Sequence, residues 1–535
     1  MRRSTFIAAT VALVGVLPPV AEAQIFKSTL SGGQEIPAVS TTGSGTAVVA
    51  LNSTTNQMTI QSNFTGLVAN TSVAHIHCCV ALQPGNAGAA TTTPSFVGFP
   101  VGVRSGTFNA TYNMTLAGTW NTAFINANGG TTAGAQARLI AGANAGQAYF
   151  NIHSVMFPAG EIRGNLARFT FAGNSGLSAR TQGAAAALDS LGAGTGALTD
   201  QLLSLAILTD ARQVAALEQM SPSTSRGLRV AAAESMDAVF DQVGDRLDGL
   251  RLTGDKASEA QGYGAWLKAF GGNSRQDDDD GFAGYSGDRW GVALGLDRSW
   301  SPGLIVGAAL SYSEQALSHE DQRTGDEDDI ESTQVSVYAS QELGDFYLDY
   351  MAAYASQSVS TMRAGASGSS GGAFDGDQYG VRVGGGRPIA LSSSLTITPQ
   401  ASLDWARLEL DGYTETGGGM LALAVESRSA DLLWASLGAQ LDFETQLGGM
   451  RTRPFLRAHW RHNFEDDGLD AAAVFVAGGA RFVTPGQSLE GESYVVGAGV
   501  TMFGGERFSA GLAYDATLSE TYQSHVVQAR ARWAF

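Results

Sequence analysis

Three histidines in the N-terminal third of the chain are the side chains whose type and spacing best suit chemistry. His75 and His77 are two residues apart, so on a β-strand both point to the same face, and His153 joins them if its strand is a neighbour. A His-x-His pair with a distant third histidine suits a copper or zinc ion, because both metals accept imidazole nitrogen. The alternative is a polar core in which the imidazoles hydrogen-bond to the backbone and to Glu161.

Two adjacent cysteines, Cys78 and Cys79, directly follow the first histidine pair and are the only cysteines in the chain. Thiols beside imidazoles would suit a soft metal ion, which makes both cysteines further candidate ligands. A disulfide between the two neighbours, formed in an oxidising compartment, is the alternative. In either case the chain lacks a framework of several disulfides, so packing must supply its stability.

Glu161 and Arg163 form a second candidate group near the third histidine. They are two residues apart and share a face if both lie on one strand, so we expect an ion pair that fixes the strand. The functional alternative is a proton donor beside the histidines. An arginine partner keeps a carboxylate ionised, which makes Glu161 a poor general acid.

The elements that must position these residues belong to a mainly β protein with more than one domain. A chain of 535 residues is too long for one core, and 68 glycines with only 15% charged residues suit strands separated by turns. Residues 1–23 combine a basic start, an apolar stretch and the cleavage site Ala21-Glu22-Ala23. This pattern predicts a signal peptide, so we expect the chain to be exported.

Charge divides the exported chain into two regions. Residues 24–168 hold five basic and two acidic side chains, whereas the whole chain has a net charge of −18. The acidic excess therefore lies in residues 169–535. Such a difference in charge indicates that the two regions are adapted to different surroundings. A nearly uncharged first domain has no basic patch for phosphates, so we expect no nucleic acid as a partner.

The region from about residue 262 to the C-terminus alternates in polarity along segments that are joined by turns, alternately short and long. This regular pattern is typical of a transmembrane β-barrel with tight periplasmic turns and long outer loops. An even number of strands returns the chain to the periplasmic side. We predict twelve antiparallel strands, starting near Tyr263, Ser286, Leu304, Asp329, Phe346, Phe374, Leu395, Val425, Thr452, Leu489, Arg507 and Gln523.

Parity within single segments shows which face meets lipid. In the last segment the apolar side chains at every second position from Val527 to Phe535 share one parity, while Gln528 and Arg530 share the other. Arg457, His459 and Arg461 are likewise expected to face the lumen, and Leu456 and Trp460 to face outward. We expect interface girdles to include Trp266, Trp290, Trp300 and Trp533.

The C-terminal half resembles the translocator domain of autotransporters, the proteins of type V secretion. The resemblance is carried by Gly262-Tyr263-Gly264-Ala265-Trp266, by Gly291 to Asp297, and by the terminal aromatic residue Phe535. It implies a barrel over residues 259–535 in outer-membrane lipid and lipopolysaccharide. It also implies that Trp533 and Phe535 form the signal read by the barrel-assembly machinery.

Residues 169–258 are predicted to form a helical linker. Apolar residues recur at helical spacing, and Ser221-Pro222 is a plausible helix start. The resemblance places a helix inside the barrel just before the first strand, where Ser225 to Leu252 stands. An ordinary periplasmic or surface helix is the alternative.

Residues 24–168 alternate Thr, Val, Ala and Asn with glycine turns, which predicts a soluble β-sandwich. This domain resembles the chordin-type (CHRD) domain, and the resemblance implies an extracellular binding module. Four motifs carry it in order: Leu30 to Pro37, Ala74-His75-Ile76-His77, Tyr149 to Ser154, and Phe157 to Gly164.

We therefore expect an outer-membrane autotransporter that exports or displays a small CHRD-like passenger at the cell surface, where it binds an unknown extracellular ligand. No catalytic residues and no required cofactor are predicted. The first alternative is a copper- or zinc-dependent redox passenger that uses His75, His77 and His153. The second is a barrel that only anchors or conducts, with the passenger left in the periplasm.

Overall fold

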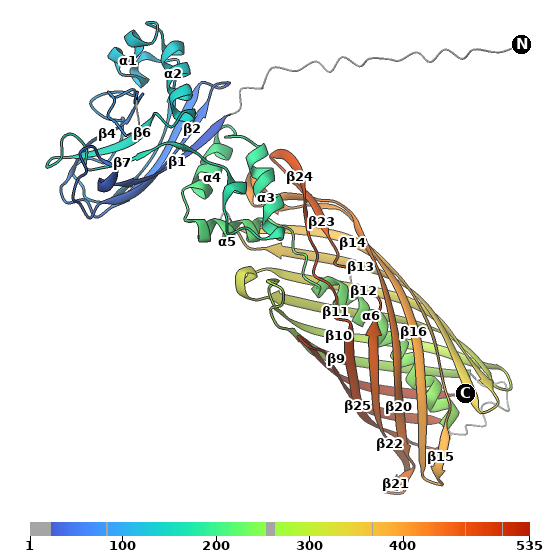
Figure 1. The fold of residues 1–535 in the computed structure, drawn as a ribbon. Coiled ribbons are helices and arrows are strands. Elements are labelled where there is room, and N and C mark those ends of the chain that lie inside the picture. The colour runs from blue at the N-terminus through green and yellow to red at the C-terminus, as the bar shows by residue number, and fades with distance from the viewer. Residues whose placement is uncertain (1–22, 82–83, 253–262, 366–367, 466, 506) are drawn as a thin grey trace, which may run out of the picture. The chain divides into compact units, whose positions relative to one another are not determined.

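The computed structural model describes residues 23–81, 84–252, 263–365, 368–465, 467–505 and 507–535. Apart from Ala23, the predicted signal peptide lies outside the described residues. The chain divides into two compact units: residues 1–174 with 188–213, and residues 175–187 with 214–535 (Figure 1). The segment predicted as one linker is therefore shared between the units.

The first unit, the passenger, is built on one antiparallel sheet in the order β4-β6-β7-β1-β2-β3-β5, with β8 beside β1. The predicted β-rich fold of this region is confirmed, and its two halves belong to one sheet, because β1 pairs with β2 along one edge and with β7 and β8 along the other. The strands are β1 (Gln24–Ser31), β2 (Ser44–Asn52), β3 (Gln57–Thr65), β4 (Thr71–His77), β5 (Gly106–Asn113), β6 (Tyr149–Ser154), β7 (Ile162–Asn165) and β8 (Ala167–Arg168).

Both halves of this sheet enclose one apolar core. Phe26 and Ile60 come from one half, Ile76 and Phe150 from the other, and all four are fully buried. The helices α1 (Thr122–Ala127) and α2 (Thr132–Asn144) belong to the same unit, and Leu139 of α2 completes the core. The sequence interpretation missed α2, whose signal is Thr131: its side chain accepts the N–H of Gly134 as an N-cap before an alanine-rich run.

The second unit contains a closed barrel of twelve antiparallel strands, as predicted. The last strand pairs with the first, so no edge remains open. The strands are β9 (Tyr263–Gln276), β10 (Tyr285–Ser301), β11 (Leu304–His319), β12 (Glu327–Leu343), β13 (Phe346–Arg363), β14 (Ser370–Gly386), β16 (Leu395–Leu410), β20 (Arg428–Phe443), β22 (Met450–Asn463), β25 (Glu492–Phe503), β26 (Phe508–Leu518) and β27 (Tyr522–Ala534).

The long loops of the barrel carry structure that the sequence interpretation missed. A four-stranded sheet in the order β17-β19-β23-β24 is built from β17 (Tyr413–Thr414), β19 (Leu423–Val425), β23 (Ala471–Phe475) and β24 (Gly478–Thr484). Its residues Leu423, Ala471 and Phe475 are buried. The short strands β15 (Ile389–Ser392), β18 (Thr416–Gly417) and β21 (Thr445–Leu447) extend the barrel sheet.

Between the passenger sheet and the barrel the chain forms α3 (Ala179–Ser190), α4 (Ala197–Ala206), α5 (Asp210–Met220) and α6 (Gly227–Leu252). The described 3₁₀ turns are Gly32–Gln34, Ala117–Thr119, Phe171–Gly173, Asp321–Arg323 and Gly419–Leu421. Among the described residues no helix combines the length and the apolar character that a bilayer crossing requires.

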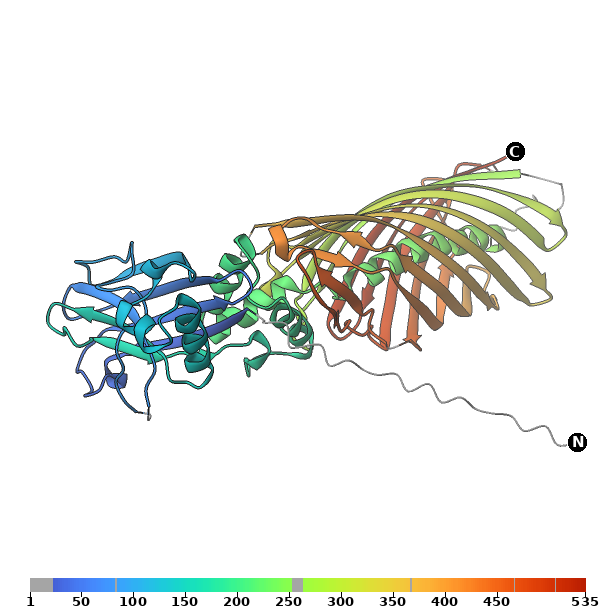
Figure 2. The same cartoon turned by 90° about the horizontal axis from the view of Figure 1, so that it is seen from above.

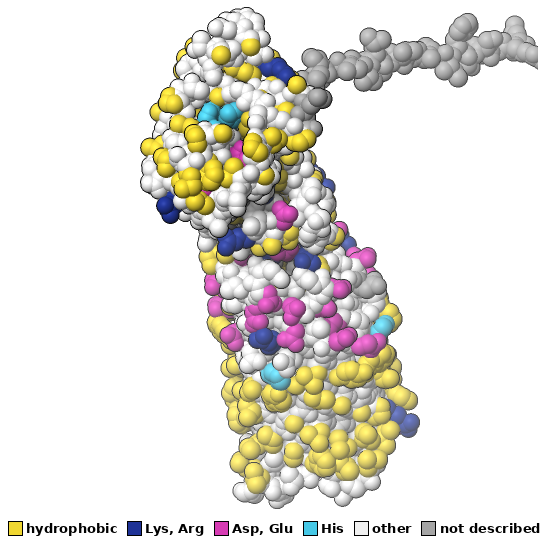
Figure 3. Space-filling view, turned by 60° about the vertical axis from the view of Figure 1, so that its left-hand side comes forward, with side chains coloured by type: hydrophobic (Ala, Val, Ile, Leu, Met, Phe, Trp, Pro, Cys, Tyr) yellow, Lys and Arg dark blue, Asp and Glu magenta, His cyan; other side chains and the backbone are white. Residues whose placement is uncertain are grey.

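The barrel wall has its polar residues inside and its apolar residues outside. In β12, Gln334 and Ser336 are buried, whereas Val335 and Val337 are more than half exposed. Figure 3 shows the consequence: hydrophobic side chains cover a band of the barrel, and acidic side chains gather beyond it. A contiguous apolar belt of this kind requires lipid as its solvent.

One predicted girdle residue lies elsewhere. Trp266 is buried inside the barrel, where its ring N–H donates to the hydroxyl of Tyr338 at 2.9 Å. Its parity along β9 turns it inward, whereas Trp290, Trp300 and Trp533 are exposed as expected. The parity predictions for β22 and β27 are confirmed, since Leu456, Trp460 and Val527 face outward.

Candidate functional site

The three passenger histidines meet on two neighbouring strands. β4 pairs antiparallel with β6, so that His77 lies opposite Tyr149 and His153 lies opposite Val73. The His75 ring centroid is 4.6 Å from that of His77 and 4.7 Å from that of His153. One nitrogen from each ring can be chosen so that all three lie within 4.8 Å of one another.

Backbone carbonyls orient two of these rings. Nδ1 of His77 is 2.8 Å from the carbonyl of Ala87, and Nδ1 of His153 is 3.0 Å from the carbonyl of Pro158. A carbonyl oxygen only accepts hydrogen bonds, so each Nδ1 must carry the proton. The Nε2 atom of each ring therefore holds a free lone pair.

One nitrogen of each ring finds no hydrogen-bond partner in the described structure. Among the described residues, Nε2 of His77, Nε2 of His153 and Nδ1 of His75 are buried and have no hydrogen-bond partner. Leaving a buried polar atom unsatisfied costs about 1–3 kcal/mol each. The predicted hydrogen bonds to the backbone are present, but Glu161 bonds to other groups, so the polar-core alternative leaves the cluster incompletely satisfied.

Burial keeps the three imidazoles neutral near pH 7. It lowers the pKa of His75 to about 3, helped by the neighbouring His77 and His153, and lowers the pKa of His77 to about 4. Burial also lowers the pKa of His153, against the hydrogen bond to Pro158. A neutral imidazole is the form that binds a metal.

The cluster is buried on one side and reaches the surface on the other. His75 and His153 are buried, and His77 is half-buried with its ring stacked on Tyr149 at a centroid distance of 4.7 Å. Figure 3 shows histidine side chains gathered in one place on the passenger surface. The ring of His77 is therefore the part of the cluster nearest to solvent.

The predicted ion pair between Glu161 and Arg163 is not formed. Glu161 precedes β7, so the two residues do not share a strand, and its carboxylate accepts the Thr41 hydroxyl and the Val68 N–H, both at 2.6 Å. Arg163 instead donates to the Gln34 carbonyl at 2.5 Å and lies 4.4 Å over the Tyr149 ring. Both side chains brace loops around the histidine strands.

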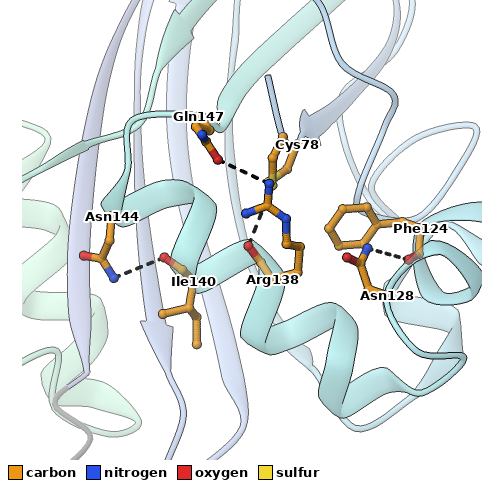
Figure 4. Close-up of a disulfide and its surroundings, with 8 residues drawn as sticks. Cys78, Phe124, Asn128, Arg138, Ile140, Asn144 and Gln147 are labelled. Carbon is orange, nitrogen blue, oxygen red and sulfur yellow. Dashed lines mark hydrogen bonds between the residues drawn. A yellow bond between two sulfur atoms is a disulfide. The ribbon is translucent and has the colours of Figure 1, made fainter. Parts of the chain in front are cut away.

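Cys78 and Cys79 are bonded to each other in a disulfide. The described cluster with metal-binding geometry consists of the three histidines and does not include these sulfurs. Figure 4 shows the disulfide beside α2, where Arg138 donates to Gln147 at 3.2 Å. A side chain at Gly142 would meet both sulfurs at 2.5 Å, so a glycine is needed at this contact.

The second candidate site is the barrel lumen, through which α6 runs (Figure 2). Arg382 on β14 donates to Asp404 at 2.5 Å and to Asp241 of α6 at 2.7 Å. Arg461 on β22 lies 2.8 Å from Asp237 of α6. Sequence parity placed Arg461 in the lumen but did not find this network, because its helical partners are fixed only by tertiary packing.

The direction of α6 is clear from its contacts. Ala231 and Ala232, near its start, pack with Tyr285 and Leu317 where the long loops leave the wall. Leu247, near its end, belongs to the apolar cluster of Trp266, which lies close to the start of β9.

Residues before α6 are held at the same long-loop end. Arg226 lies 2.5 Å from Asp279, and the Thr224 hydroxyl donates to the carbonyl of Pro485 at 2.8 Å. Arg323 donates to the carbonyls of Glu218 and Ser221. The chain therefore enters the lumen from the long-loop end, and α6 ends near the start of β9 at the short-turn end.

Comparison with known proteins matches both domains. Residues 265–515 match the family model described as the autotransporter beta-domain, and residues 26–166 match that of the CHRD domain. Outer membrane protein B of Rickettsia typhi is 24% identical over 294 residues, which cover 53% of this chain and 18% of that protein. An extracellular serine protease of Serratia marcescens is 23% identical over 297 residues, covering 54% and 27%.

Among solved structures, the translocator domain of the autotransporter NalP from Neisseria meningitidis aligns with a TM-score of 0.45 and 16% identity, covering 57% of this chain and 98% of that one. The beta domain of the Bordetella autotransporter BrkA aligns with a TM-score of 0.41 and 20% identity, covering 52% and 100%. The chain spans less than a third of the length of the curated relatives described above.

The closed wall, the apolar belt and the polar lumen define an outer-membrane β-barrel protein. More specifically, the barrel is an autotransporter β-domain, and it follows an N-terminal CHRD domain.

Proposed function

We propose that the barrel holds the CHRD passenger outside the cell, where the passenger binds an extracellular ligand rather than catalysing a reaction. The direction of α6 is the observation that carries this proposal. The residues before Gly227 are bonded at the long-loop end of the barrel, and long loops face the cell exterior in outer-membrane barrels. Everything N-terminal to α6 then leaves the barrel on the outer side.

The lumen network supports the same proposal. Asp237 and Asp241 of α6 are tied to arginines of the wall, and breaking one partner of a buried ion pair is costly. The helix is thus anchored in the barrel after the passenger has crossed. We propose that export ends in this plugged state, with the passenger still attached by α6.

The passenger's own polar groups support a binding role. Residues 24–168 of the passenger have only two carboxylates, Glu35 and Glu161, and that of Glu161 is engaged by Thr41 and the backbone of Val68. Such an engaged carboxylate is a poor acid or base. We therefore propose that the domain acts through its surface.

The assembly partner is proposed from the barrel seam. Phe535 donates its backbone N–H to the carbonyl of Tyr263 at 2.9 Å, so the C-terminus lies against the first strand at the point of closure. Phe535 and Trp533 are both exposed there. We propose that the barrel-assembly machinery binds these two aromatic side chains before the seam closes, and that lipid and lipopolysaccharide surround the finished barrel.

Protease treatment of intact cells tests passenger display. We expect added protease to remove the passenger from intact cells and to leave the barrel with α6 in the membrane. If the passenger is cut only after the outer membrane has been permeabilised, the passenger lies in the periplasm and the proposal is wrong.

Cysteine labelling provides a matched test of barrel orientation in the full chain. Asp278→Cys lies in a long loop and Ser393→Cys in a short turn, and both positions are exposed. A membrane-impermeant maleimide should label Asp278→Cys in intact cells, and Ser393→Cys only after permeabilisation. The reverse pattern would invert the barrel and overturn the proposal.

A further inference from the structure

We infer that His75, His77 and His153 form a binding site for one divalent transition-metal ion of the zinc and copper class, held by three imidazole nitrogens. This inference does not depend on which side of the membrane the passenger occupies. It rests on the geometry of the cluster and on the hydrogen bonds around it.

The first argument is convergence. Three histidines from two strands, separated by up to 78 positions in the chain, bring one nitrogen each to within 4.8 Å of the others. A tetrahedral ion with bonds of about 2.0–2.1 Å holds its ligand atoms about 3.3 Å apart. Moving the rings by about 1 Å or less therefore closes the site without changing the strand pairing.

The second argument is the state of the individual nitrogens. The protonated Nδ1 atoms of His77 and His153 are held by backbone carbonyls, and the opposite Nε2 atoms are buried with no partner in the described structure. Metal-binding histidines usually show this arrangement, in which an outer hydrogen bond fixes the tautomer and the ring orientation. A cluster with only a packing role would have no reason to leave three ring nitrogens buried and unpaired.

The third argument is ligand chemistry. Three neutral imidazoles suit zinc and copper, whereas calcium and magnesium prefer oxygen ligands. No thiolate competes at the site, because Cys78 and Cys79 are joined in a disulfide. With three protein ligands, one coordination position of a tetrahedral ion remains for water or a ligand donor.

The test measures metal content of the full chain purified in detergent. The protein is stripped with a chelator, dialysed against Zn²⁺ or Cu²⁺, freed of loosely bound ions and analysed by mass spectrometry of the elements. We expect one ion per chain. Wild-type protein that retains neither ion would overturn the inference, whatever the variants do.

Variants locate the ion. His77→Ala, and separately His75→Ala with His153→Ala, should lose it, whereas the matched control His462→Ala should retain it, because His462 pairs with Glu492 on the barrel. Chymotrypsin resistance of the passenger establishes that each variant still folds. Retention of one ion by a folded His77→Ala chain would overturn the inference.

Spectroscopy gives a readout that does not require substitution. Electron paramagnetic resonance of the Cu²⁺-loaded full chain should show coupling to three imidazole nitrogens, and His77→Ala should remove it. Coupling to fewer nitrogens, or a spectrum unchanged by His77→Ala, would place the ion elsewhere and overturn the assignment.

Discussion

The passenger and the barrel are both antiparallel β structures, yet they bury opposite kinds of side chain. Val49 of the passenger is fully buried, whereas Val337 of the barrel is 56% exposed. Gln334 and Ser336 of the barrel are buried around α6, in positions where the passenger has apolar residues. The alternation of polarity therefore specifies a strand in both regions. The apolar face points inward where water surrounds the domain, and outward where lipid surrounds the barrel.

The largest effect is expected from a charge in the passenger core. Val49→Asp buries a carboxylate with no partner, which should destabilise the passenger by more than about 4 kcal/mol. Chymotrypsin digestion of the full chain in detergent should then degrade the passenger, while the barrel keeps its heat-modifiable mobility on gels. Val97→Asp is the control, since Val97 is 76% exposed; equal sensitivity of both variants would contradict the core assignment.

A charge on the outward face of the barrel should have a smaller but clear effect. Val337→Arg places a guanidinium in the apolar band and should reduce the free energy of unfolding by about 2 kcal/mol in lipid. Asp329→Arg lies on the same face of the same strand, beyond the band, and should change it by less than about 0.5 kcal/mol. Urea unfolding in vesicles measures both. Equal cost at the two positions would mean that lipid does not cover Val337.

The smallest effect is a pH dependence confined to the passenger. Burial raises the pKa of Glu35 to about 7, against the nearby Arg163 and Asn151. The folded state holds this proton more tightly than the unfolded state, in which the pKa of Glu35 is near 4.5. The resulting contribution to stability is fully present below pH 4.5 and is lost as the pH rises through about 7. Glu35→Gln should therefore gain stability relative to wild type between these pH values, by about 1–2 kcal/mol after allowance for solvent screening.

The measurement is passenger unfolding in both chains as a function of pH, with the barrel transition as internal reference. The lowered pKa values of the three histidines act in the opposite direction, destabilising the fold as pH falls, but they are common to both chains. A constant difference between the two chains across this range would contradict the raised pKa of Glu35.

Sequence alone determined most of the barrel. Alternation along segments such as 527–535 and glycine-rich short turns set twelve strands and their outward faces, because both signals are local. The sequence did not predict that Trp266 points into the barrel, because an aromatic side chain near the end of a strand is equally typical of an interface girdle and of a packed interior. The loop sheet of β17, β19, β23 and β24 was missed because its pairings join short segments that are distant in the chain.

For the candidate site, the sequence determined which residues had suitable chemistry but not which of them meet. The His75–His77 spacing fixed one shared face, because side chains alternate along a strand. Only the pairing of β4 with β6 brought His153 beside them, and only the start of β7 at Ile162 separated Glu161 from Arg163. Strand order and the exact ends of strands depend on packing between distant segments, and that information exists only in the folded structure.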